Sequence, residues 1–147
     1  MNYETFCKLF SEYVPPAMHE GERYYLANDA VESFRSGEKR KPYAKGLFLG
    51  MGHREFIPSP ALLQILSKHS NKKAVLKDDK AEWLFVCGRD IFPGYYETKI
   101  TEGYVLVQNQ YDENLGLGKI ELDGKQGIII KNILDSGNYL RHEQVKM

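Results

Sequence analysis

The sequence predicts an α+β protein with two modules: a mixed α/β module over residues 1–70, and a β-barrel with one main helix over residues 74–147. Two observations lead to this prediction. In the first half, apolar residues recur alternately at helical and at strand-like spacing. In the second half, a single helical segment is followed by short apolar strands about ten residues apart with turn residues between them, which is typical of a small barrel or sandwich.

Composition supports a folded chain but does not favour a particular partner. Hydrophobic residues make up 42% and charged residues 27% of the 147 residues, close to the globular average. Twenty acidic and twenty basic residues cancel, so any nucleic-acid surface has to be a local patch. Cys7 and Cys87 have no metal-ligand spacing and are expected to be reduced thiols. Because the start has no apolar signal core and no long apolar run follows, we expect a cytoplasmic protein without a membrane partner.

Six elements are expected in the first module. Pro15-Pro16 ends the first helix, and Ser59 with Pro60 begins the last one. A polar, basic loop over residues 36–42 separates the middle elements. The expected elements are a helix at 3–14, a strand at 23–26, a helix at 28–35, strands at 44–50 and 54–58, and a helix at 60–66.

A polar linker at residues 67–73 is expected to precede the second module. Asp78 or Asp79 caps a helix that runs through Cys87, with Ala81, Leu84, Phe85 and Gly88 on one face. Core packing is favoured for Trp83, Phe85 and Phe92. The strands are expected at 74–77, 96–100, 104–108, 115–121 and 127–131.

The helix leads into an unusual turn at residues 88–95. Gly88 is followed by Arg89, Asp90, an apolar pair and Pro93-Gly94. This order resembles the signature of the PUA domain, an RNA-binding pseudo-barrel. From Ala74 to Met147 the chain looks like a complete PUA domain, including Gly116-Leu117-Gly118-Lys119.

Two more specific resemblances concern the rest of the chain. The tail at residues 135–143 resembles the ending of the Nip-seven ribosome-biogenesis factors, which carry a pre-PUA α/β module ahead of the PUA domain. Residues 46–50 and 56–62 are similar to the RNA-binding C-terminal region of Sun-family RNA cytosine methyltransferases. Both imply binding of rRNA or tRNA, in ribosome assembly, rRNA processing or RNA modification. Neither places a catalytic residue here.

The candidate RNA contacts are backbone groups of the turn and cations around the barrel. A glycine turn lets backbone approach a ligand, and a guanidinium suits phosphate. The alternative for the strand lysines is an ordinary solvated side chain at a strand edge. For the basic run it is a solvated loop, and for the arginine of the turn it is a solvated side chain at a tight corner. The candidates are Arg89, Gly94 and Tyr95 in the turn, Lys119, Lys125 and Lys131 on the strands, Arg141 and His142 in the tail, and Lys39, Arg40 and Lys41 in the basic loop.

The sequence gives little reason to expect an enzyme. The sequence contains no Walker motif and no dinucleotide-binding fingerprint, and its four histidines lack the spacing of zinc ligands. Cys87 falls near a helix end rather than at the helix N-terminus that would lower the pKa of its thiol. We therefore expect no catalytic residue, cofactor or metal. The alternative to RNA binding is an adaptor that docks an RNA methyltransferase or a ribosome-assembly factor.

Overall fold

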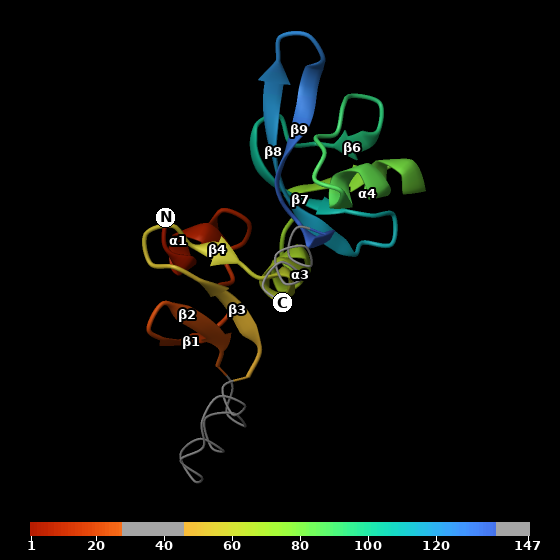
Figure 1. The fold of residues 1–147 in the computed structure, drawn as a ribbon. Coiled ribbons are helices and arrows are strands. Elements are labelled where there is room, and N and C mark those ends of the chain that lie inside the picture. Colours follow the sequence, from red (N-terminus) through yellow and green to blue (C-terminus); the bar gives the residue numbers. More distant parts are fainter. Residues whose placement is uncertain (28–45, 138–147) are drawn as a thin grey trace. The chain divides into compact units, whose positions relative to one another are not determined.

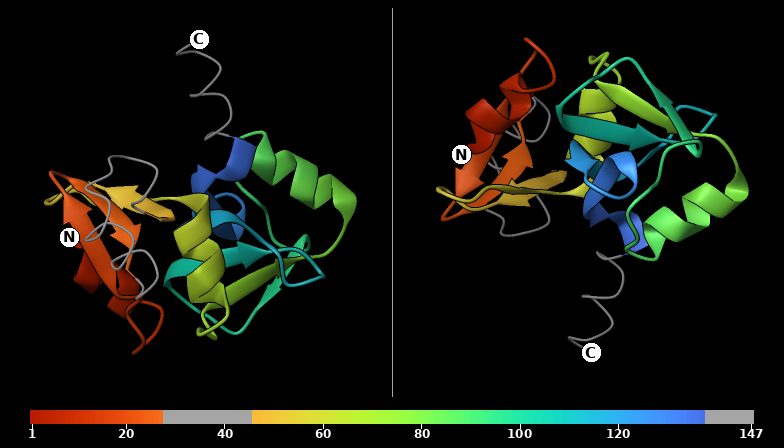
Figure 2. Two further views of the ribbon diagram at one scale, coloured as in Figure 1. Left: turned by 90° about the horizontal axis from the view of Figure 1, so that it is seen from below. Right: turned by 90° about the horizontal axis from the view of Figure 1, so that it is seen from above.

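The computed structural model describes residues 1–27 and 46–137, and the chain divides into two compact units, residues 1–69 and 70–147. Figure 1 shows the elements of each unit, and Figure 2 gives two further views. The helix expected at 28–35 and the basic loop lie outside the described residues, as does the end of the tail. Among the described residues, no helix is long and apolar enough to cross a membrane.

The first unit contains an antiparallel sheet in the order β1-β2-β3-β4. The strand β1, which the sequence did not predict, pairs with β2 through a tight turn at Gly21, whose φ is +60°. The strand β3 is shifted toward the C-terminus from the strand expected at 44–50, and β4 is shorter than the strand expected at 54–58. The bounds are β1 Ala17–Glu20, β2 Arg23–Leu26, β3 Phe48–Met51 and β4 Ile57–Pro58.

Two helices complete the first unit: α1 (Tyr3–Lys8) and α3 (Pro60–Ser67). The Ser59 hydroxyl accepts a hydrogen bond from the Leu62 amide at 3.1 Å, as its predicted capping role requires. The prediction of a helix to residue 14 is wrong, because α1 ends well before the proline pair. Aromatic rings fill much of the buried interior, whose members include Tyr3, Phe6, Phe10, Leu49, Phe56, Leu62, Leu63 and Leu66.

The second unit is a curled five-stranded sheet in the order β6-β5-β7-β8-β9, which forms a pseudo-barrel. Only the β5–β7 pair is parallel, because α4 (Asp79–Val86) and β6 intervene between those strands in the chain. The last two strands are longer than predicted and form a long hairpin (Figure 1). The bounds are β5 Lys73–Leu76, β6 Tyr96–Thr98, β7 Gly103–Gln108, β8 Asn114–Asp123 and β9 Gly127–Asp135.

The helix α4 packs against the concave side of this sheet, and both views of Figure 2 show it beside the end of β9. Phe85 is fully buried in the core that the sheet and the helix share. A Cβ at Gly116 would collide with the Leu134 carbonyl and the Phe85 ring, and one at Gly118 would collide with Ile130. The Gly-Leu-Gly-Lys motif is therefore a packing motif: its glycines make room for the helix and the neighbouring strand.

The prediction of core packing is wrong for two of the three aromatic residues. Phe85 is buried, but Trp83 is 64% exposed and Phe92 is 45% exposed. Trp83 is two residues from buried Ala81, and two residues rotate a side chain by about 200° around a helix, away from the core face. Phe92 follows buried Ile91, which forms a bridge with Ile130, and adjacent residues in extended chain point to opposite sides.

The exposure of Trp83 predicts a small effect of its removal on stability. Trp83→Ala should lower the free energy of unfolding by less than about 1 kcal/mol, because an exposed side chain leaves no cavity. Phe85→Ala should lower it by about 3–5 kcal/mol, as is usual for a buried phenylalanine. Urea unfolding followed by circular dichroism measures both. Equal losses for the two variants would contradict the orientation of α4.

The two cysteines should differ in reactivity. Cys7 is fully buried, and burial raises the pKa of its thiol to about 11, whereas Cys87 is exposed at the end of α4. Because the thiolate is the reactive form, a disulfide reagent at pH 8 should label one thiol quickly in the folded protein and the second only in denaturant. In Cys87→Ser the fast phase should vanish. Two fast thiols in the native protein would contradict the burial of Cys7.

Candidate nucleic-acid interface

The turn after α4 begins with two backbone hydrogen bonds that end the helix. Gly88 has a φ of +92°, and its amide donates to the Phe85 carbonyl at 2.9 Å. The Arg89 amide donates to the Leu84 carbonyl at 3.0 Å. These two bonds form a Schellman motif, in which glycine at the left-handed position ends a helix. The predicted chain reversal at Gly88 is confirmed, and the exposed Arg89 side chain follows it directly.

Asn132 of β9 fixes the same turn to the sheet. Its side-chain amide donates to the Phe85 carbonyl at 2.8 Å and to the Arg89 carbonyl at 3.3 Å. The Asp90 carboxylate in turn accepts the backbone amide of Asn132 at 2.8 Å. One residue later, Ile91 and Ile130 exchange two backbone hydrogen bonds of 2.9 Å. Asp90, the aspartate of the signature, therefore attaches the turn to β9. These hydrogen bonds also hold the backbone of Arg89 beside β9.

Two predicted lysines lie opposite each other on the outer side of the barrel. Lys119 of β8 pairs in register with Lys131 of β9, and Tyr104 of β7 is the partner of Lys119 on its other side. Side chains of directly paired residues share a face of the sheet. The Lys119 ammonium lies 5.4 Å from the centre of the Tyr104 ring and 3.6 Å from the Glu121 carboxylate. Lys131 is exposed and forms no ion pair with any described residue.

The second group of candidates lies near the closed end of the β8–β9 hairpin. Gly94 has a φ of +95°, and no atom would contact a Cβ there, so its backbone is open to solvent. Pro93 lies close to Gly127, and the Tyr96 hydroxyl donates to the Ile128 carbonyl at 2.6 Å. These contacts place the Pro-Gly turn beside the start of β9. Lys125 is exposed in the hairpin turn that immediately precedes this strand.

The side chain of Tyr95, a predicted RNA contact, is only partly exposed. It is half-buried, packs against the core of the second unit, and its ring lies 5.8 Å from the Lys80 ammonium. The adjacent Tyr96 is also half-buried, and burial raises the pKa of its hydroxyl. The structure thus places Lys119 and Lys131 side by side on one face of the sheet. The backbone of Arg89 lies beside Asn132, and Gly94 and Lys125 lie near the start of β9. The candidates Lys39, Arg40, Lys41, Arg141 and His142 lie outside the described residues.

Sequence reasoning missed three residues that shape this surface. Tyr104 is the first: side chains alternate along β7, so Tyr104 points to the other face from the buried Val105, which is the outer face. Lys80 precedes Trp83 and Cys87 at helical spacing, and this spacing indicated the exposed face of α4. For Asn132 no sequence signal was available, because its partners are 43 to 47 positions away.

The described residues offer little for catalysis or metal binding. No group of three or more histidine, cysteine, aspartate or glutamate side chains in the described part of the chain could hold a metal ion. Between residues 70 and 137, eleven acidic side chains face nine basic ones, so the second unit has no overall attraction for phosphate. Binding of an anion there depends on the local cations named above.

The attachment of the turn predicts a stability effect. Asn132→Ala should lower the free energy of unfolding by about 1–3 kcal/mol, because the Arg89 carbonyl loses its side-chain donor and the Phe85 carbonyl loses one of its donors. The exposed Asn71 provides a matched control, and Asn71→Ala should change stability by less than about 0.5 kcal/mol. Thermal and urea unfolding measure both variants. If the two substitutions had equal effects, the Asn132 amide would not hold the turn.

Comparison with known proteins agrees with this geometry. Residues 73–144 match the model of a family described as the UPF0113 PUA domain. A UPF0113 protein of Archaeoglobus fulgidus is 32% identical over 113 residues, which are 70% of this chain and 64% of that protein. The chain thus spans slightly less than two-thirds of that relative. A solved structure of a conserved PUA domain protein from Thermoplasma acidophilum has a TM-score of 0.54 at 19% identity, over 82% of this chain and 74% of that one. The second unit therefore has the PUA pseudo-barrel fold, and its residues 73–144 match the UPF0113 PUA domain family.

Proposed function

We propose that this chain is a non-catalytic RNA-binding protein that holds structured RNA on the outer side of its PUA unit. The fold supports the general function, since the PUA domain is an RNA-binding fold. The specific surface consists of Arg89, Lys119 and Lys131, with Gly94 and Lys125 at the hairpin end. Tyr95, Arg141, His142, Lys39, Arg40 and Lys41 remain predicted contacts of the same function.

The observation that carries the proposal is the pairing of Lys119 with Lys131. Like charges directly opposite each other on a sheet are destabilising, so this pair has a cost in the free protein. Glu121 offsets the charge of Lys119, but no described residue offsets that of Lys131. A phosphate oxygen near both ammonium groups would relieve the repulsion. Arg89, whose carbonyl accepts a hydrogen bond from the Asn132 side chain, adds an exposed forked donor beside β9.

This surface is better suited to binding double-stranded RNA than to recognising individual bases. The deep major groove of A-form RNA hides base edges, so proteins recognise its shape, phosphates and 2′-hydroxyls. The surface offers cations and open backbone at Gly94, while the nearby rings of Tyr95 and Tyr96 are half-buried. We therefore expect binding of a stem or stem end with little dependence on base sequence.

The biological role follows from the resemblance to the Nip-seven factors and to the Sun-family extension. We propose a role in rRNA processing or ribosome assembly, or in presenting rRNA or tRNA to a modification enzyme. The second candidate is an adaptor that docks an RNA methyltransferase or an assembly factor. The excess of eleven acidic over nine basic residues between positions 70 and 137 favours this adaptor, because it weakens long-range attraction to RNA.

Salt dependence tests RNA binding. The affinity for an RNA stem-loop with a single-stranded tail should fall steeply with salt, with a log–log slope of about −0.7 to −0.9 per phosphate contacted. Removing one contacting cation, as in Lys131→Ala, should make the slope shallower by about that amount. The exposed Lys99, at the far end of β6, gives the control Lys99→Ala, which should change nothing. Fluorescence anisotropy over a salt series measures these slopes.

Two results would contradict this proposal. The first is RNA affinity that does not change with salt. The second is unchanged affinity in a variant that combines Arg89→Ala, Lys125→Ala and Lys131→Ala. Absence of RNA binding, together with capture of an RNA methyltransferase or assembly factor, would favour the adaptor.

A further inference from the structure

The β8–β9 hairpin extends beyond its neighbour β7 and leaves a free strand edge. β8 pairs with β7 only as far as Ile120, whose partner is Gly103. It pairs with β9 as far as Asp123, whose partner is Gly127. Residues Glu121 to Asp123 therefore have a strand on one side, and no described strand on the other. Figure 1 shows the hairpin projecting past the rest of the sheet.

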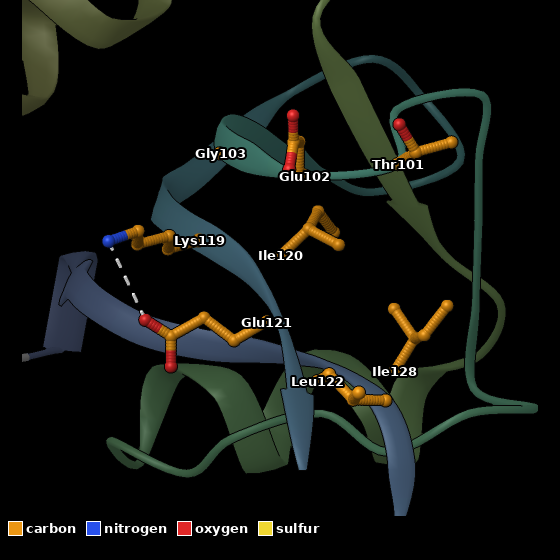
Figure 3. A pocket seen from close by; sticks show the side chains of 8 residues that line it. All are labelled: Thr101, Glu102, Gly103, Lys119, Ile120, Glu121, Leu122 and Ile128. Carbon is orange, nitrogen blue, oxygen red and sulfur yellow. Dashed lines mark ion pairs between the residues drawn. The ribbon is translucent and has the colours of Figure 1, made fainter.

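A cavity of about 740 Å³ adjoins this free edge. The loop that leads into β7, Thr101 to Gly103, forms one side of it, and the hairpin forms the other (Figure 3). Ile120, Leu122 and Ile128 provide an apolar surface between them. Ile120 is almost fully buried, whereas Leu122 is 80% and Ile128 is 49% exposed. Apolar side chains this exposed, gathered at one place, mark a surface that a partner covers.

The charged groups around the cavity indicate the sign of that partner. Glu102 and Glu121 are carboxylates, and Lys119 is the one cation among the lining residues. Lys119 lies 3.6 Å from Glu121, so the charge of Glu102 remains without a counter-ion in the cavity. Excess negative charge next to an apolar surface disfavours RNA phosphates. It favours a basic, partly apolar polypeptide.

We propose that this edge binds an extended peptide segment of a partner protein, which adds as a strand beside Glu121 to Asp123. Backbone hydrogen bonds to a sheet edge provide affinity in this mode of recognition, and pockets for alternate side chains provide specificity. The proposal does not require the RNA-binding function, because the peptide is held by the apolar face of the hairpin, by its backbone edge and by carboxylates. The two surfaces meet at Lys119, which lines the cavity.

The alternation of a strand specifies the pattern of the segment. Side chains on one face of the added strand lie over Leu122 and Ile128, and are therefore apolar. Those on the other face lie beside Glu121, and opposite charges across a sheet are favourable. Glu102, on the facing loop, adds to the attraction for basic residues. The segment thus alternates apolar and basic residues, as in a run of valines and lysines.

A labelled peptide of alternating lysine and valine, seven residues long, is the probe. Its binding to the full chain, followed by fluorescence anisotropy, should saturate and should weaken about tenfold in Leu122→Ser and in Ile128→Ser, as expected for losing one apolar contact. Ile57 of β4 is 56% exposed and lies in the first unit. Ile57→Ser is therefore the matched control, with unchanged binding. Equal melting temperatures verify that the three variants are folded.

Backbone pairing and charge are tested separately with modified peptides. In two versions of the probe, every second backbone amide is methylated, at odd positions in one and at even positions in the other. One version should lose binding, because only one set of amides faces the edge. In Glu102→Lys, affinity for the lysine–valine peptide should fall, and affinity for a glutamate–valine peptide should rise.

Four outcomes would overturn the proposal. No binding of the probe at 1 mM would do so, and so would equal binding of both methylated versions. A third is self-association of the protein that Leu122→Ser abolishes, since the edge would then belong to a second copy of this chain. The fourth is an RNA stem-loop that displaces the bound lysine–valine peptide and itself binds more weakly to Leu122→Ser, which would assign this face to RNA.

Discussion

The attachment of the turn after α4 to β9 is the contact on which the second unit depends. A helix that packs on a curled sheet needs a return path for the chain, and Gly88 provides it at the helix end. Asn132 then binds two carbonyls of the returning segment, and Asp90 accepts the amide of Asn132. The Ile91–Ile130 bridge continues this pairing along β9. These contacts hold Phe85 inside the sheet, so helix, turn and strand form one structural element.

The edge of β9 and the overhang of the β8–β9 hairpin are two different kinds of surface. The returning segment runs beside β9, so exposed Arg89 lies next to this strand, while Lys119 and Lys131 share one face of the β8–β9 pair. The hairpin continues past the end of β7, so its apolar face at Leu122 and Ile128 is left uncovered. Lys119 and Lys131 share one face of the β8–β9 pair, and apolar and acidic groups gather at the hairpin overhang. The proposed RNA contacts and the proposed peptide site thus lie on the same hairpin.

Local signals in the sequence predicted much of the fold. Asp78 caps α4 with a 2.8 Å hydrogen bond from the Ala81 amide, and Ser59 caps α3 in the same way. The strands of the barrel lie where alternating apolar residues indicated them. The wrong predictions concern residues whose helical or strand spacing has to be compared with that of their neighbours. Ala81 and Phe85 define the buried face of α4, and Trp83 lies away from that face. Gly21 marks the turn between β1 and β2, which is the sequence signal for β1.

The sequence by itself determined the α+β class, the caps, the reversal at Gly88 and the PUA resemblance, because each depends on residues close together in the chain. The tertiary structure alone decided which candidate cations meet. Lys119 and Lys131 face each other only because of the β8–β9 register, and the backbone of Arg89 is held beside β9 by Asn132. It also revealed the free edge at Glu121 to Asp123, since that edge results from unequal strand lengths. Register and strand length depend on pairing between distant segments, and residues close together in the chain do not encode that pairing.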